Sequence, residues 1–260
     1  MKTIFKTMGI SLFMVVSSIL TISCEKDMMN SDNIQYATLL DVSSDGISTV
    51  INKNMEAALV ETPDLLDNEL NSLLKMKEEE KLARDVYTFL YGKWGSAVFS
   101  KISAAENNHL DAIIRLLQYY GSADTLAGEA GIFANIEVHA LYNTLVAKGS
   151  ESIEGAYKTG ALIEEMDIKD LRDAIEATSN SNIIMVFENL ERGSRNHLRA
   201  FNRQLTITGK IYTPIYITQS DYDQIVNSTM EKGNQYRMQG KGYGRGNGFG
   251  NGYGKRRGRH

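Results

Sequence analysis

The stretch ISAAENNHLDAIIRL, residues 102–116, decides the fold. Its apolar residues recur at spacings of three and four, which predicts an amphipathic helix over about residues 96–120. Glu106 and His109 interrupt the apolar stripe and lie on the same face, one turn apart. Two such side chains on one helix can bind one metal ion together, so the stretch predicts both a helix and a site.

Three further segments show the same helical periodicity. They run over about residues 64–91, 150–178 and 181–205. The stripe of each is also interrupted near its middle, by Glu80, Glu164 and His197 in turn. The sequence therefore predicts an all-α fold with four long helices.

The connection between the second and third helices is long. Residues 121–149 contain a glycine-rich turn and then a short helical pattern over about residues 136–147. A ferritin-like bundle needs a long crossover at this point. Both prolines, Pro63 and Pro214, fall outside the long periodic segments, which favours uninterrupted helices. We therefore expect a ferritin-like four-helix bundle with a short extra helix between helices 2 and 3.

The interrupted stripes predict a metal centre. Burying unpaired carboxylates costs several kcal/mol each, so they need a partner, and a shared metal supplies one. Di-iron carboxylate bundles use a Glu from each of two helices and Glu-x-x-His from each of the other two. The matching residues are Glu80, Glu106, His109, Glu164 and His197. Carboxylate and imidazole ligands suit iron, with two ions expected, or manganese.

The fourth helix departs from this pattern. Ser194 stands where the second Glu-x-x-His would place its glutamate, three residues before His197, so one carboxylate is missing. Asp167 on the third helix could replace it as a metal ligand. Glu188 and Glu191 are weaker substitutes, because neither lies three or four residues from His197.

Adjacent glutamates leave the register of two helices open. Glu79 could stand for Glu80, and Glu165 for Glu164, although the spacing of the apolar stripes favours Glu80 and Glu164. His139, on the crossover helix, and His260, at the end of the chain, are not expected to be ligands.

The N-terminal residues predict export and lipidation. Lys2 and Lys6 precede an apolar run from residue 8 to residue 20, and the chain then reads LTISC up to Cys24. We interpret residues 1–23 as a lipoprotein signal peptide and Cys24 as the lipidated N-terminus, which would anchor the protein to the cell envelope, on its periplasmic face or outer surface. The alternative is a plain secretory signal with an incidental cysteine. Since Cys24 is the single cysteine, an intrachain disulfide and a thiol-based site are excluded.

The two flanks of the helical region differ from it in composition. Residues 24–62 are polar and weakly periodic, and we interpret them as a lipidated tether to a domain over residues 63–232 that includes a short C-terminal extension. Residues 233–260 are rich in glycine, arginine and tyrosine, which predicts a disordered basic tail. Aromatic residues between arginines can bind nucleic acid, but for an exported protein we favour contact with anionic envelope components.

Four blocks carry a family resemblance. They are MKEEEKLARDVYTFLYGKWG, FSKISAAENNHLDAIIRLL, ALIEEMDIKDL and ENLERGSRNHLRAFNRQL, in this order. Together they resemble a bacterial and archaeal ferritin-like domain family of unknown function, related to the rubrerythrin and ferritin group, over about residues 65–205. The resemblance implies a four-helix ferritin-like fold with a di-iron or related two-metal centre.

These observations lead to one functional hypothesis and one competitor. We expect an envelope-anchored ferritin-like metal-binding protein; any enzymatic activity would be redox chemistry of the oxidase or peroxidase type. Its expected partners are metal ions and, through Cys24, a membrane; a homodimer is compatible with this assignment, and nucleic acid is not an expected partner. The competitor is a non-enzymatic helical interaction module of the envelope, with a hydrogen-bonded polar core and no metal.

Overall fold

The structure, a computed structural model, describes residues 40–42, 48–50, 55, 58–122 and 129–232. The predicted signal peptide, the lipidation site at Cys24 and the basic tail over residues 233–260 lie outside the described residues. No helix among the described residues is long and apolar enough to cross a membrane.

Six helices dominate the described residues, and they confirm the all-α class. Two three-residue strands precede them, β1 (Leu40–Val42) and β2 (Ser48–Val50), which pair antiparallel. The helices are α3 (Asp67–Trp94), α4 (Ala97–Tyr119), α5 (Ile136–Gly149), α6 (Ile153–Glu176), α7 (Ser181–Ile207) and α8 (Gln219–Asn227). The four long ones fall close to the ranges predicted from periodicity.

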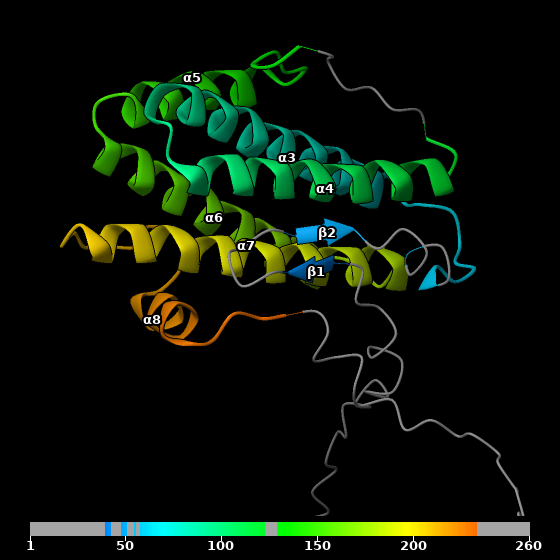
Figure 1. The fold of residues 1–260 in the computed structure, drawn as a ribbon. Helices are drawn as coiled ribbons and strands as arrows, with labels where there is room; N and C mark the ends of the chain where they lie inside the picture. Colours follow the sequence, from blue (N-terminus) through cyan, green and yellow to red (C-terminus); the bar gives the residue numbers. More distant parts are fainter. Residues whose placement is uncertain (1–39, 43–47, 51–54, 56–57, 123–128, 233–260) are drawn as a thin grey trace, which may run out of the picture. The chain divides into compact units, whose positions relative to one another are not determined.

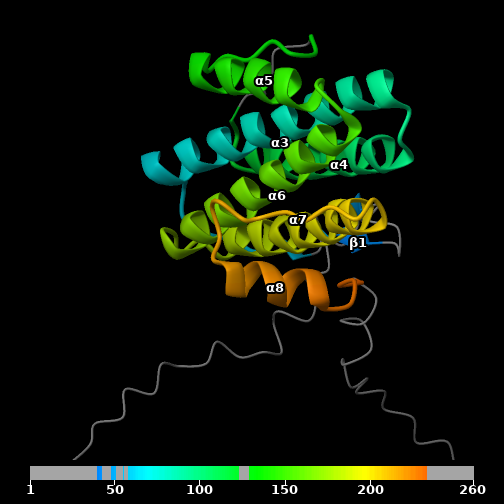
Figure 2. The same ribbon diagram turned by 90° about the vertical axis from the view of Figure 1, so that its left-hand side faces the viewer.

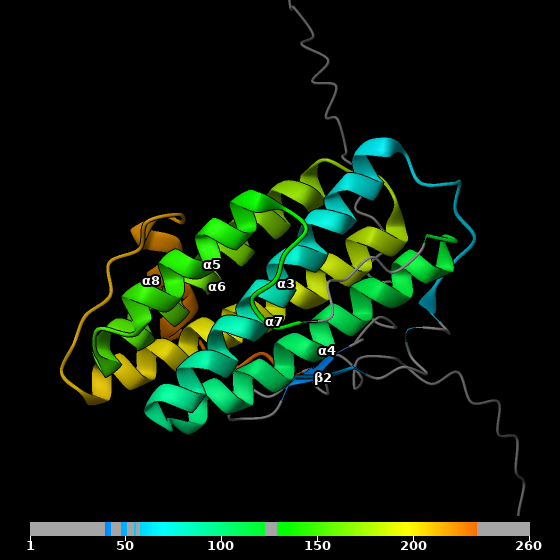
Figure 3. The same ribbon diagram turned by 90° about the horizontal axis from the view of Figure 1, so that it is seen from above.

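The four long helices pack side by side. α3 packs against α4 and α6 against α7, and the two pairs meet through α3 with α6 and α4 with α7 (Figures 1 and 3). α5 lies on α3 and α6, and α8 lies on α7 on the other side of the molecule (Figure 2). The α3–α4 turn is tight because Gly95 adopts the left-handed conformation, with φ of 63°, and ends α3.

The range interpreted as a tether contains described residues that pack on the helices. β2 lies against α4 and β1 against α7. Met55 is 1% exposed and belongs to an apolar cluster with Leu73 and Phe187. Asn182 also binds the backbone of Val60 in both directions, at 3.0 and 2.9 Å. The sequence signals for these contacts are weak because the segment has little periodicity of its own.

The core divides into two apolar clusters. One contains Tyr87, Leu90 and Phe201 together with residues from α5 and α8, and the other contains Leu73 and Ile113. Along each long helix, the residues of one cluster are followed by polar residues and then by residues of the other cluster. A polar layer therefore crosses the interior between the two clusters.

Packing around Gly160 leaves no room for a methyl group. A Cβ at Gly160 would lie 2.5 Å from Cε1 and Cζ of the buried Phe201, whereas a Cβ at Gly92 of α3 would meet nothing within 4 Å. We expect Gly160→Ala to lower the free energy of unfolding by about 1–3 kcal/mol through overpacking. Gly92→Ala should raise it by up to about 1 kcal/mol through helix propensity. Urea denaturation of the two variants measures both changes, and a neutral Gly160→Ala would contradict the packing.

Candidate metal centre

Five side chains of the polar layer converge from four helices. Glu80 comes from α3, Glu106 and His109 from α4, Glu164 from α6 and His197 from α7. Glu80 is 2% exposed and the other four are fully buried. These are the five residues that the sequence pattern predicted, and we call them the centre.

Glu106 lies in the middle of the centre. Its Oε2 is 2.8 Å from Nδ1 of His109, and its Oε1 is 2.9 Å from Nδ1 of His197. Glu80 Oε2 lies 3.2 Å from Nδ1 of His109, and Glu164 Oε2 lies 3.4 Å from Nδ1 of His197. The centre thus consists of two groups, Glu80 with Glu106 and His109, and Glu106 with Glu164 and His197, each with its ligand atoms within 4.8 Å of one another.

The two imidazoles lie face to face. The ring centroids of His109 and His197 are 5.3 Å apart and the rings are inclined by 18°. Gly193 makes room for this arrangement, because a Cβ there would lie 2.5 Å from Cε1 and Nε2 of His109. Periodicity did not single out Gly193; the only signal was a glycine inside a helical pattern, which often marks a close approach.

Several polar atoms of the centre lack a hydrogen bond to any described residue. They are both carboxylate oxygens of Glu106, Oε2 of Glu164 and both ring nitrogens of His197. These atoms instead form ion pairs within the centre, at 2.9 Å between Glu106 and His197 and at 3.4 Å between Glu164 and His197. Carboxylate oxygens with imidazole nitrogens form a common donor set for metal ions. The residues present therefore fit a metal centre better than a closed hydrogen-bond network.

Tyr87 fixes one of the carboxylates of the centre from outside. Its hydroxyl donates to Oε1 of Glu164 at 2.6 Å and lies 3.2 Å from the carbonyl oxygen of Gly160. This contact occupies one carboxylate oxygen of Glu164 and leaves Oε2 on the side of His197. Such outer hydrogen bonds orient the ligands of metal sites.

The structure shows which member of each adjacent glutamate pair faces the centre. Glu80 and Glu164 belong to the centre, whereas Glu79 pairs with Lys75, with Oε1 3.4 Å from Nζ. Glu165 points to the segment after α7, where it accepts hydrogen bonds from the hydroxyl of Tyr212 and from backbone N–H groups, among them that of residue 215 at 2.9 Å. Glu165 therefore holds a loop in place, and sequence reasoning missed this role.

The substitutes considered for the missing carboxylate lie outside the two groups. Asp167 is 5% exposed, and its Oδ2 has no hydrogen-bond partner among the described residues, but it joins neither group. Glu191 pairs instead with Arg172 and Arg195, and Glu188 also lies outside. Ser194 donates to the carbonyl of residue 190 in its own helix at 3.2 Å.

Of the two remaining histidines, one lies among the described residues. His139 lies on α5 beside the ring of Phe133, at a centroid distance of 6.3 Å. His260 falls outside the described residues.

Burial and mutual charge shift the pKa values of the centre strongly. Burial, helped by the neighbouring Glu106 charge, raises the pKa of Glu80 to about 8 and that of Glu164 to about 7. Burial lowers the pKa of His109, but Glu80 and Glu106 outweigh it and bring this pKa to about 9. Burial also opposes charge on Glu106, yet His197 and His109 hold its pKa well below the ordinary value. Without a metal, Glu106 is thus a carboxylate between two protonated imidazoles.

The fold and the centre define a class: a helical protein with a buried layer of carboxylates and imidazoles contributed by four helices. Residues 69–229 match the family described as Uncharacterized protein domain (DUF2202), and the chain belongs to this family. All five residues of the centre lie within the matched range.

Two comparisons concern one archaeal relative. The chain is 45% identical over 168 residues to Uncharacterized protein MJ0754 of Methanocaldococcus jannaschii, a match that covers 64% of this chain and 91% of the relative. It is also similar to the crystal structure of hypothetical protein MJ0754 from Methanococcus jannaschii DSM 2661. That match has a TM-score of 0.64 and 44% identity, and it covers 66% of this chain and 99% of the other.

The metal-free chain should lose stability as the pH rises from 4.5, the ordinary pKa of a glutamate, to about 9, the pKa of His109. Glu80, Glu164 and His109 have raised pKa values, so the native state holds more protons than the unfolded chain in this range. The free energy of unfolding then falls by about 1.4 kcal/mol per pH unit for each excess proton. The lowered pKa of Glu106 acts in the opposite direction, but only below pH 4.5.

Urea denaturation in the presence of a chelator, repeated across this pH range, measures the effect. The Glu80→Gln/Glu164→Gln double variant removes two of the groups whose pKa values are raised and should show a shallower decline. A stability that is constant or rises with pH in the metal-free wild type would contradict the charge distribution of the centre.

Proposed function

We propose that this protein is a ferritin-like metal-binding protein of the cell envelope, with a two-metal carboxylate centre for iron or manganese. The observation that carries the proposal is the position of Glu106. One fully buried carboxylate is shared by two groups, each completed by one further carboxylate and one imidazole. Two equivalent groups around one shared carboxylate are what a pair of bridged ions requires.

The donor types support iron or manganese. In this proposal Glu80, Glu106 and His109 would hold one ion, and Glu106, Glu164 and His197 would hold the other. Carboxylates and imidazoles together suit iron, manganese and zinc, whereas sites for soft ions use thiolate or thioether ligands. The charge of the ions would also compensate the three buried carboxylates.

The helix arrangement supports the ferritin-like part of the proposal. α3, α4, α6 and α7 each contribute to the centre, as in di-iron carboxylate bundles. The connection between α4 and α6 carries α5, which corresponds to the long crossover of such bundles. The departure is Ser194, since α7 supplies an imidazole without the usual carboxylate.

The proposed activity is redox chemistry of the oxidase or peroxidase type. A bound pair of iron or manganese ions would supply the electrons for reaction with oxygen or peroxide. The protein's own contribution is to bury the residues of the centre, to orient Glu164 through Tyr87 and to hold the Glu106 carboxylate between two imidazoles. The competing function, a metal-free interaction module, would require the same polar layer to be stable without ions.

Metal analysis of the full chain tests the centre. After reconstitution with iron or manganese, we expect about two ions per chain and a higher melting temperature than in the chelated protein, because ligands that bind only the folded state stabilise it. Glu106→Gln/His109→Gln should lose both effects.

The control for this test is Glu137→Gln/His139→Gln. It changes a Glu and a His on α5 that lie outside the centre, so it should keep its metal. If the wild type takes up neither ion, and its melting temperature does not respond to chelation, the metal centre is wrong and the interaction module gains support.

The envelope anchor is a separate part of the proposal and rests on the sequence before Cys24. In a bacterial host, we expect the wild type in the membrane fraction, with an N-terminal peptide that begins at an acylated Cys24. Cys24→Ala should abolish acylation, and Ser31→Ala should have no effect. Mass spectrometry of the N-terminal peptide measures the outcome; a membrane-bound protein with an unmodified Cys24 would contradict lipidation.

A further inference from the structure

A second set of acidic side chains leads from the centre to the surface between α3 and α6. Asp167 and Asp170 follow Glu164 on α6 at successive intervals of three residues, and Glu79 faces them from α3. Their exposure rises outward, from 5% for Asp167 to side-chain values of 16% for Glu79 and 27% for Asp170. We call Glu79 and Asp170 the entrance carboxylates.

A lysine ammonium already lies between the entrance carboxylates. Nζ of Lys75 is 3.0 Å from Oδ2 of Asp170 and 3.4 Å from Oε1 of Glu79. The side chain of Lys75 is 55% exposed, and exposed ion pairs of this kind contribute only about 0–1 kcal/mol. Carboxylates from two helices therefore hold a cation at this position. Moving the Lys75 ammonium away would cost little free energy.

Asp167 connects the entrance to the centre. Its Oδ2 is buried and has no hydrogen-bond partner among the described residues, and the same holds for Oε2 of Glu79. Burial raises the pKa of Asp167, and so do the carboxylates of Glu80, Glu164, Glu106 and Glu79. The carboxyl group of Asp167 thus lies within electrostatic reach of both the centre and the entrance.

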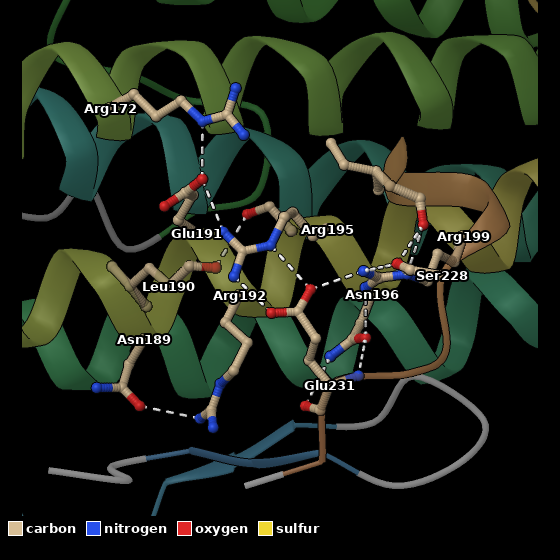
Figure 4. Close-up of polar contacts among 12 residues, drawn as sticks. Arg172, Asn189, Leu190, Glu191, Arg192, Arg195, Asn196, Arg199, Ser228 and Glu231 are labelled. Carbon is tan, nitrogen blue, oxygen red and sulfur yellow. Dashed lines mark hydrogen bonds and ion pairs between the residues drawn. The ribbon is translucent and has the colours of Figure 1, made fainter. Parts of the chain in front are cut away.

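Another approach to the centre is less favourable for a cation. The outer side of α7 carries Arg195 and Arg199, which pair with Glu231 of the segment after α8, and Arg172 of α6 reaches Glu191 beside them (Figure 4). This side is rich in guanidinium groups and covered by the C-terminal segment.

α5 packs at the C-terminal end of α3, where the indole of Trp94 donates to the carbonyl of Gly149 at 2.8 Å. Lys75 and Glu79 lie in the N-terminal half of α3, and the side chain of Lys75 is 55% exposed.

We propose that Glu79, Asp170 and Asp167 form a transit site for a divalent cation on its way to the centre. The ion displaces the Lys75 ammonium from the entrance carboxylates and passes by way of Asp167 to Glu80 and Glu164. The inference rests on the proposed two-metal centre, but it concerns the rate of metal uptake rather than the number of ions bound.

Time-resolved Co(II) uptake by the metal-free full chain tests the route. Co(II) accepts the same oxygen and nitrogen donors, and its visible absorption reports binding. The Glu79→Gln/Asp170→Asn double variant should load about tenfold more slowly, because a charged approach raises on-rates by about 10–10³. Its final absorption, stoichiometry and melting temperature should equal those of the wild type.

Two further variants sharpen the test. Asp173→Asn removes one negative charge one turn further along α6, at an exposed pair with Lys169, and should load at the wild-type rate. Lys75→Met removes the competing ammonium and should load faster than the wild type.

The outcomes separate the transit site from the centre. If the double variant loads at the wild-type rate, or if Asp173→Asn slows loading as much as the double variant does, the transit site is wrong while the centre stands. If the double variant binds fewer ions at equilibrium, the entrance carboxylates are permanent ligands and transit is likewise wrong. If the wild type binds no Co(II), iron or manganese, both proposals fail.

Discussion

The structure depends on one buried carboxylate, that of Glu106, between the imidazoles of His109 and His197. A charge at this depth is tolerated only when opposite charge or an ion lies within a few ångströms. The compensating groups come from other helices, so α3, α6 and α7 must each bring one side chain to the level of Glu106. The axial register of the four long helices is thereby coupled to the electrostatics of a single residue.

The two apolar clusters on either side of the polar layer fix the directions of the helices. α3 and α7 run from the cluster of Leu73 to the cluster of Phe201, and α4 and α6 run the opposite way. Shifting one helix by a turn would bring polar residues against apolar ones in both clusters. Apolar burial and charge compensation therefore favour the same helix arrangement. Agreement between these two contributions is what specifies a single fold.

Sequence periodicity predicted the long helices and the residues of the centre because both follow from spacing along one helix. It could not predict contacts between segments that are distant in sequence. The loop held by Glu165 is one case, and the approach of Gly193 to His109 is another. A third is the fully buried Lys81, whose ammonium lies over the ring of Phe133. Each depends on which distant segment faces the residue, and one sequence does not contain that information.

α7 lacks the carboxylate that di-iron bundles have at the position of Ser194, and Asp167 of α6 provides a buried carboxyl group nearby. A pair of divalent ions is neutralised by four carboxylates, and the centre itself provides three. Asp167 places a fourth carboxyl group next to the centre without joining either group. A carboxylate that balances charge without binding permanently is free to bind an arriving ion briefly. Under the two proposals, α7 carries serine at position 194 where di-iron bundles carry a glutamate, and the fourth carboxyl group lies instead on the path by which ions would arrive.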